Sequence, residues 1–94
     1  MRVRWLRTAL ANLGAEAEYI ARDNPAAATR VVQAITDAVD QLKQYPAMGR
    51  PGRITGTREL VVCGTPYIVP YRVRKNELEI LRVFHAARRW PTQF

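Results

Sequence analysis

The spacing of apolar and polar positions changes early in the chain. "RVRW", residues 2–5, alternates with a period of two, which is typical of a short strand. From Leu6 onward the apolar residues recur every three or four positions, which predicts an amphipathic helix. The face that this helix is expected to bury consists of Leu6, Leu10, Leu13, Ala17 and Ile20. The first twenty residues therefore predict a strand that leads directly into a helix.

A second helix is predicted after a short break. Asn24 is a good N-cap and Pro25 suits the first helical position, so one helix ends and another begins there. The apolar stripe of the second helix consists of Ala28, Val31, Val32, Ile35, Val39 and Leu42. Pro46 stops this helix, because the residue before a proline is pushed out of helical geometry. Two helices joined by so short a turn are expected to pack as an antiparallel hairpin.

The second half of the chain has β-type patterns. Residues 46–57 are rich in glycine and proline and are predicted to form a loop. Three strands joined by short connections are predicted at residues 58–62, 67–73 and 77–84. Pro70 lies inside the middle strand, and because proline has no N–H for the ladder, we expect a bulge or a locally unpaired edge there.

Together these patterns predict an α+β fold in the order β-α-α-β-β-β. An antiparallel helix hairpin packs on one face of a small, mainly antiparallel sheet, and residues 86–90 add a short C-terminal helical turn. At this length we expect one domain, residues 1–94.

No stretch approaches the roughly 20 apolar residues of a membrane span. The single cysteine, Cys63, is expected to be buried, and it suits a reducing compartment, so we predict a cytoplasmic protein.

The net charge of +7 is concentrated in the second half of the chain. Residues 1–48 carry six Arg and Lys against five acidic residues, whereas residues 49–94 carry nine against three. Solubility alone would account for a basic surface. So uneven a distribution nevertheless favours an acidic partner, either a nucleic acid or an acidic protein segment.

The side chains available for chemistry exclude several classes of site. One His and one Cys are too few for a zinc site, the sequence contains no serine for a Ser-His-Asp arrangement, and "GRPGR" at residues 49–53 lacks the spacing of a phosphate loop. We therefore expect no metal and no cofactor. Arg50 and Arg53 in that loop remain surface cations that could contact phosphates.

Cleavage of RNA through its own 2′-hydroxyl would need a base, an acid and cations around one phosphorus. The candidate proton carriers are His85, Glu59, Tyr67 and Tyr71, and the candidate cations are Arg72, Arg74, Arg82, Arg88 and Arg89. Arg72 and Arg82 are expected near the middles of neighbouring strands, on one face. The ordinary alternative is that strand arginines are solvated and that the histidine is structural. Arg88, Arg89 and Trp90 are also residue types enriched at protein-binding hot spots.

Several segments resemble the RelE/ParE superfamily of bacterial toxins. They are "AEYIARDNPAAATRVV", "YPAMGRPGRITGTRELVV", "PYIVPYRV" and "EILRVFHAARRW", and they cover nearly the whole chain in the order of the superfamily. The resemblance implies a two-helix, antiparallel-sheet toxin of a type II toxin–antitoxin module that arrests growth. It also implies a cognate antitoxin whose acidic segment wraps the toxin.

Within this superfamily, RelE-like members cut mRNA on the ribosome and ParE-like members poison DNA gyrase. RelE-like nucleases typically carry lysines or an acid around the second strand, an arginine early in the third strand, and a tyrosine or histidine near the C-terminus. Here the third strand begins with the apolar run at residues 67–69, and the second carries Arg58 and Glu59 without a lysine, although His85 remains. The comparison favours a ParE-like gyrase inhibitor with no catalytic residue assigned.

Two alternatives stay open. The first is a ribosome-dependent mRNA endonuclease, for which the catalytic candidates are His85, Arg72 and Arg82. The second is a non-toxic binding domain that acts only in an antitoxin complex. For contacts with a target or an antitoxin, the predicted residues are Arg50, Arg53, Arg58, Arg74, Arg88, Arg89 and Trp90.

Overall fold

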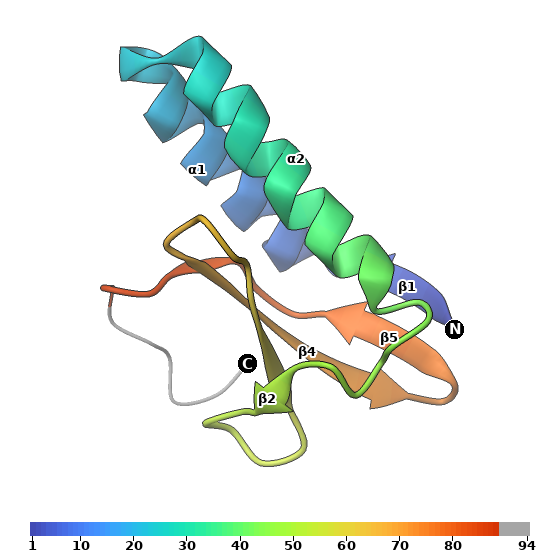
Figure 1. Cartoon of the computed structure of the whole chain (residues 1–94). Coiled ribbons are helices and arrows are strands. Elements are labelled where there is room, and N and C mark those ends of the chain that lie inside the picture. Colours follow the sequence, from blue (N-terminus) through green and yellow to red (C-terminus); the bar gives the residue numbers. More distant parts are fainter. Residues whose placement is uncertain (89–94) are drawn as a thin grey trace.

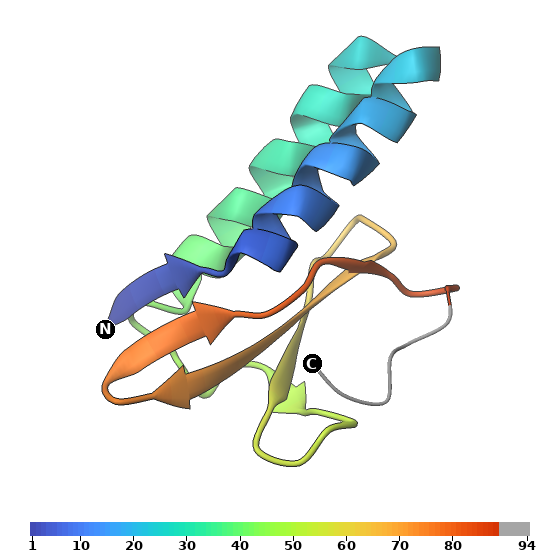
Figure 2. The same ribbon diagram turned by 180° about the vertical axis from the view of Figure 1, so that it is seen from behind.

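The computed structural model describes residues 1–88, in which a helix hairpin covers one face of a β-sheet (Figure 1). The elements follow in the order β1 (Arg2–Trp5), α1 (Arg7–Asp23), α2 (Pro25–Gln41), β2 (Arg50–Pro51), β3 (Arg58–Val61), β4 (Tyr67–Arg74), β5 (Glu77–Ile80) and β6 (Phe84–His85). The view from behind in Figure 2 shows both helices on the same side of the sheet. The predicted α+β fold is confirmed.

The sheet has the strand order β1-β5-β4-β3-β2, and β6 pairs with β4 beyond the end of β5. Strand β1 runs parallel to β5, and all other pairs are antiparallel. The mainly antiparallel sheet is thus as predicted. The strand predicted at residues 77–84 is instead divided into β5 and β6 by residues 81–83, and the two-residue strand β2 is additional. A two-residue strand such as β2 has too few positions for an alternating pattern, so it leaves little trace in the sequence.

The turn between the helices depends on Asn24. Its backbone N–H donates to the Ile20 carbonyl at the end of α1, and its Oδ1 accepts from the N–H of Ala27 at 3.1 Å. Such an N-cap stabilises a helix by about 1 kcal/mol, and Pro25 at the first helical position needs no hydrogen-bond partner for its nitrogen. The predicted break between the helices is therefore confirmed, together with its cause.

The buried face of α1 differs from the predicted one. Ala9 is fully buried, whereas Leu10 is 53% exposed. The packed face is centred on Ala9, Leu13 and Ile20, and Leu10 lies about 100° around the helix from Ala9. The prediction was wrong at Leu10 because the small side chain of Ala9 lets the helix approach the sheet closely, a contact that hydrophobicity alone does not indicate.

Pro70 lies opposite an irregular segment, as predicted. On one side it pairs with Glu59 of β3 without a break. On its other side Tyr71 pairs with Ile80 and Ile68 pairs with Phe84, so residues 69–70 face the three residues 81–83. This is a one-residue bulge. The Pro70 carbonyl accepts from the Leu81 N–H at 2.9 Å, so the Pro70 nitrogen also faces the bulge. Because the strands are not regularly paired there, the lack of an N–H on proline removes no hydrogen bond from the sheet.

The core lies between the helices and the sheet. It contains Ala9, Ile35, Val39 and Leu42 from the helical half, packed on Leu60, Val62, Tyr67, Val69, Tyr71, Leu78, Ile80 and Val83. Alternate residues of β4 face this core, so Arg72 and Arg74 point to the face of the sheet away from the helices. No helix within residues 1–88 is long and apolar enough to cross a membrane.

Cys63 is exposed, and the expectation that it is buried was wrong. Strand β3 ends at Val61, and Cys63 lies in the turn that leads to β4. Turn residues face solvent, because their backbone polar groups need water or local partners.

Candidate functional site

Several of the predicted site residues lie beside one of three carboxylates, Glu79, Glu59 and Glu16, which occupy different parts of the fold. Glu79 lies on the sheet face away from the helices. The strand register places it between Arg4 of β1 and Arg72 of β4. Arg72 Nε donates to Glu79 Oε1 at 2.8 Å, and Arg4 Nη1 lies 3.5 Å from Glu79 Oε2. The hydrogen bond from Arg72 and the neighbouring positive charges lower the pKa of Glu79 against the opposing effect of burial.

The same arrangement is repeated two residues earlier on β5, on the same face of the sheet. Glu77 lies between Arg2 and Arg74 in register. Arg2 Nε is 3.5 Å and Arg4 Nη1 is 3.9 Å from the Glu77 carboxylate. Two rows of the pattern Arg-Glu-Arg therefore cross strands β1, β5 and β4.

Glu59 is buried, with 3% of its surface exposed, and it anchors the loop that follows β2. Arg50 Nε donates to Glu59 Oε1 at 3.1 Å, and Arg50 Nη2 lies 3.0 Å from the same oxygen. The backbone N–H of Arg53 donates to Oε2 at 3.0 Å. Both carboxylate oxygens thus have partners within the fold, and two of the predicted binding arginines are held by the same carboxylate.

Tyr71 and Arg58 hold residues 46–49 against the sheet. The Tyr71 hydroxyl donates to the Pro46 carbonyl and accepts from the Gly49 N–H, both at 2.8 Å. Arg58 Nη1 donates to the Gly49 carbonyl at 2.8 Å. Burial raises the pKa of Tyr71, which keeps its proton at neutral pH. Both side chains therefore stabilise this loop.

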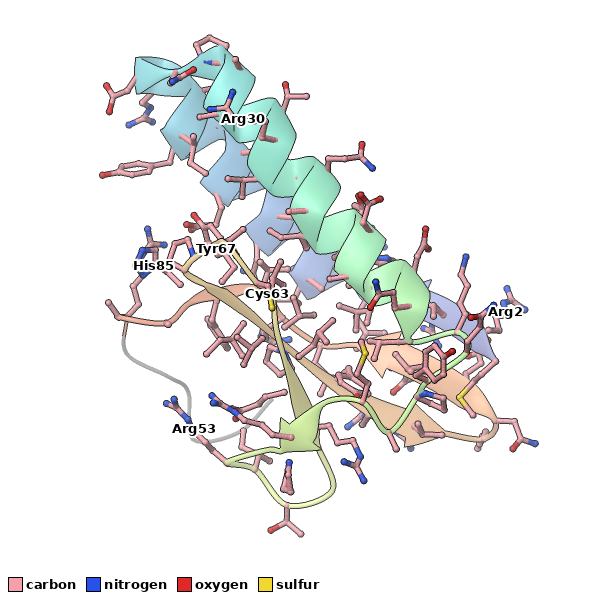
Figure 3. All side chains as sticks on the ribbon, in the orientation of Figure 1. Arg2, Arg30, Arg53, Cys63, Tyr67 and His85 are labelled. Carbon is pink, nitrogen blue, oxygen red and sulfur yellow. The ribbon has the colours of Figure 1, made fainter. Side chains whose placement is uncertain are left out.

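Glu16 joins helix α1 to the end of the sheet where β4 starts and β6 ends. Its Oε1 accepts from the Tyr67 hydroxyl at 2.9 Å, and its Oε2 contacts Nη1 of Arg88. The Tyr67 and His85 rings meet edge to face, with centroids 5.6 Å apart (Figure 3). Burial and the hydrogen bond to Glu16 raise the pKa of Tyr67 to about 12. Glu16 in turn raises the pKa of Arg88.

One ring nitrogen of His85 accepts a hydrogen bond from the backbone. Its Nδ1 accepts from the backbone N–H of Ala87 at 3.2 Å, within a turn that the Arg88 N–H closes on the His85 carbonyl at 3.0 Å. An acceptor at Nδ1 places the ring proton of the neutral imidazole on Nε2. The helical turn predicted at residues 86–90 is described only as far as Arg88, and Arg89 and Trp90 lie outside the described residues.

The cluster of Arg72, Arg82 and His85 that we predicted for a nuclease is not formed. His85 pairs with Tyr67, which faces the helices, whereas Arg72 pairs with Glu79 on the opposite face. Arg82 lies in the bulge, and its Nη1 donates to the Leu81 carbonyl at 2.7 Å. That prediction was wrong because the unbroken alternation of β4 sends residues 67 and 72 to different faces.

Sequence reasoning missed Glu16. A signal was present, because Glu16 lies three residues after Leu13 and four before Ile20, on the packed face of the predicted helix. An acidic residue on an apolar helix face requires a partner within the fold. Among residues 1–88, no group of three His, Cys, Asp or Glu side chains could hold a metal ion.

An apolar groove separates α2 from β3. Its volume is about 520 Å³, and its lining includes Ala34, Ala38, Met48, Val61 and Cys63. Met48 and Val61 are 43% and 47% exposed. Within the described chain, β2 pairs only with the first two residues of β3, so the outer edge of β3 is open beside the groove. An open edge with an apolar groove is a surface on which an added strand or helix can pack.

Comparisons with known proteins agree on one family. The family model described as the ParE toxin of the type II toxin–antitoxin system parDE matches residues 3–90. Y4kP of Sinorhizobium fredii, which is named as a toxin, is 53% identical over 90 residues, covering 96% of this chain and 93% of its own. Toxin RelE2 of Caulobacter vibrioides is 42% identical over 84 residues, covering 89% and 93%.

Two solved structures share the fold. The chromosomal ParDE toxin–antitoxin system of Pseudomonas aeruginosa matches with a TM-score of 0.82 and 34% identity, over 90% of this chain and 95% of that one. The RelBE2 toxin–antitoxin complex of Mycobacterium tuberculosis matches with a TM-score of 0.65 and 28% identity, over 89% and 95%. The resemblance to RelE/ParE toxins is thus confirmed, and the chain belongs to the family of ParE toxins of type II toxin–antitoxin systems.

Proposed function

We propose that this toxin inhibits DNA gyrase by binding it, without cutting RNA, and that a cognate antitoxin neutralises it. The observation that carries the proposal is the separation of Arg72 and His85 on opposite faces of the sheet. A nuclease must bring a base, an acid and cations to one phosphorus. A protein that acts by binding has no such requirement.

The other candidate proton carriers support the same proposal. Glu59 is buried, with both oxygens in use by Arg50 and the Arg53 backbone. Tyr71 is fully buried beneath the loop that it holds. Tyr67 has a pKa of about 12, so it would remain protonated at neutral pH and could not accept a proton.

The antitoxin is expected to occupy the groove between α2 and β3. The exposed side chains of Met48 and Val61 and the open edge of β3 offer apolar contacts and backbone hydrogen bonds side by side. Support also comes from the two similar solved structures, the ParDE system of Pseudomonas aeruginosa and the RelBE2 toxin–antitoxin complex of Mycobacterium tuberculosis. The predicted acidic segment of the antitoxin would find Arg50 at one end of this groove.

The mRNA endonuclease remains the second candidate, because one observation favours it. His85, Tyr67, Arg88 and Glu16 form a connected set at one end of the sheet, which brings an imidazole close to a guanidinium and a carboxylate. One relative is also named RelE2. In this candidate His85 would be the acid or base, since Tyr67 and Glu16 already bind one another.

The deciding experiment compares the wild-type chain with His85→Phe. Phenylalanine keeps a ring against Tyr67 and removes both titratable nitrogens. Each chain is induced without an antitoxin, with pulse labelling of DNA, RNA and protein synthesis, and is then tested on purified gyrase in a supercoiling assay. A gyrase inhibitor stops DNA synthesis first and keeps this effect in the variant.

Two other results would overturn the proposal. If protein synthesis falls first, transcripts are cut and His85→Phe abolishes both effects, the chain is a nuclease. If neither chain arrests growth although both accumulate, the chain is a non-toxic binding domain. In that event an antitoxin complex would be its only active form.

A further inference from the structure

We infer that the face of the sheet away from the helices binds the phosphodiester backbone of double-stranded DNA. This surface, the ladder face, consists of Arg2, Arg4, Arg72, Arg74, Lys75, Glu77 and Glu79. It lies on β1, β5, β4 and the turn between β4 and β5, and Figure 3 labels Arg2 at its β1 end. The inference goes beyond gyrase inhibition, and it can be tested without gyrase.

The ladder face arranges its cations regularly. Arg2 and Arg4 lie two residues apart on β1, as do Arg72 and Arg74 on β4, so each pair is spaced by about 7 Å along its strand. Arg4, Arg72, Arg74 and Lys75 line a shallow hollow of about 380 Å³. An extended row of cations suits the repeated charges of a nucleic acid backbone better than a single small anion.

The two glutamates do not cancel this charge. Five cations face two carboxylates, which leaves the ladder face at +3. Glu79 takes one hydrogen bond from Arg72, and a guanidinium has further N–H donors that can point outward. Arg2 and Arg4 keep 80% and 57% of their side chains exposed. By fixing the arginine side chains in place, the glutamates reduce the conformational entropy lost on binding.

The backbone conformation of Lys75 is a separate observation that supports binding at the ladder face. It occupies the two-residue turn between β4 and β5 with φ of 52°, followed by Asn76 with φ of 62°. Turns of this kind favour asparagine or glycine, and a lysine is strained there. The ammonium adds nothing to the turn itself, but it lines the hollow beside Arg74. A strained residue whose only visible contribution is charge indicates a binding role.

The chemistry of the ladder face favours duplex phosphates over two other acidic partners. None of its seven residues is aromatic, so it offers no ring on which the bases of a single strand could stack. The apolar side chain of Leu6 also lines the hollow, but leucine is under-represented among the residues that anchor a protein segment at a hot spot. A guanidinium group, in contrast, can donate two parallel hydrogen bonds to the oxygens of one phosphate, and such contacts do not depend on the base sequence.

The test uses the full chain and a fluorescent DNA duplex of random sequence, with binding followed by anisotropy over a range of salt concentrations. The test variant combines Arg74→Gln with Lys75→Asn, because asparagine suits the positive φ and should leave the turn at least as stable. The matched control combines Arg22→Gln with Arg30→Gln, which removes the same charge from the helix hairpin. Figure 3 labels Arg30 on α2, away from Arg2.

We expect the wild-type chain to bind duplexes of different sequence equally. The test variant should lose at least about tenfold in affinity at low salt, and its plot of log affinity against log salt should be shallower by about 2, whereas the control keeps the wild-type slope. The inference is overturned if the wild-type chain does not bind the duplex, or if the control loses as much as the test variant. It is also overturned if a single-stranded RNA or a poly-glutamate peptide competes better than the duplex.

Discussion

Glu16 and Tyr67 lie 51 positions apart in the sequence, and a hydrogen bond of 2.9 Å joins them. This bond connects the middle of α1 to the first residue of β4. The same carboxylate contacts Arg88, and the Tyr67 ring packs against His85. Through Arg88, Glu16 therefore fixes the position of residues 86–88, which follow β6, relative to the helix hairpin.

Replacing Tyr67 with phenylalanine should remove this bond and keep the buried ring. We expect the free energy of unfolding to fall by about 1 kcal/mol, because a typical side-chain hydrogen bond contributes that much and Glu16 retains Arg88 as a partner. Urea unfolding followed by circular dichroism measures the change. Tyr19→Phe is the matched control, since Tyr19 is 60% exposed on α1, the helix that carries Glu16, and its variant should unfold like the wild type. Equal stability of both variants would show that the bond contributes nothing.

Two glycines should respond in opposite directions to alanine. A Cβ on Gly49 would lie 2.6 Å from a ring carbon of Tyr71, and the loop above that ring cannot move without losing two hydrogen bonds. We expect Gly49→Ala to destabilise the fold by about 1–3 kcal/mol. Gly14 lies within α1, and apart from its neighbours in the helix no atom lies within 4 Å of the added Cβ, so Gly14→Ala should stabilise by about 0.5–1 kcal/mol. Thermal unfolding of the two variants gives both signs in one experiment.

Acid should weaken the fold through Glu79. Its pKa is lowered in the folded state, so the charged carboxylate contributes stability above its unfolded value, near 4.5, and this contribution is lost as the pH falls through the folded value. Glu79→Gln should therefore lower the midpoint of thermal unfolding at neutral pH and make it less sensitive to pH in the acid range. The exposed Glu18 provides a control, Glu18→Gln, that should keep the wild-type acid response. An unchanged pH profile in Glu79→Gln would contradict this assignment.

The sequence indicated those features that local chemistry determines. Asn24 and Pro25 mark a helix boundary by themselves, and Pro70 implies a bulge because it lacks an N–H. The separation of Arg72 and His85 could not be predicted in the same way. It depends on which residues pair across β4, β5 and β6, and the one-residue bulge at residues 81–83 reverses the alternation between β5 and β6.

Cys63 provides a direct test of the proposed antitoxin groove. The thiol is exposed and lines the groove beside Val61, so a thiol reagent should modify it readily in the free toxin. Bound antitoxin should slow that reaction strongly, because a segment packed on α2 and β3 would cover the sulfur. A chain with Cys63→Ala and Arg30→Cys carries its thiol on the exposed surface of α2, outside the groove lining, and should react equally fast with and without antitoxin. If antitoxin binds but Cys63 reacts at an unchanged rate, the antitoxin occupies another surface, and the groove has no part in neutralisation.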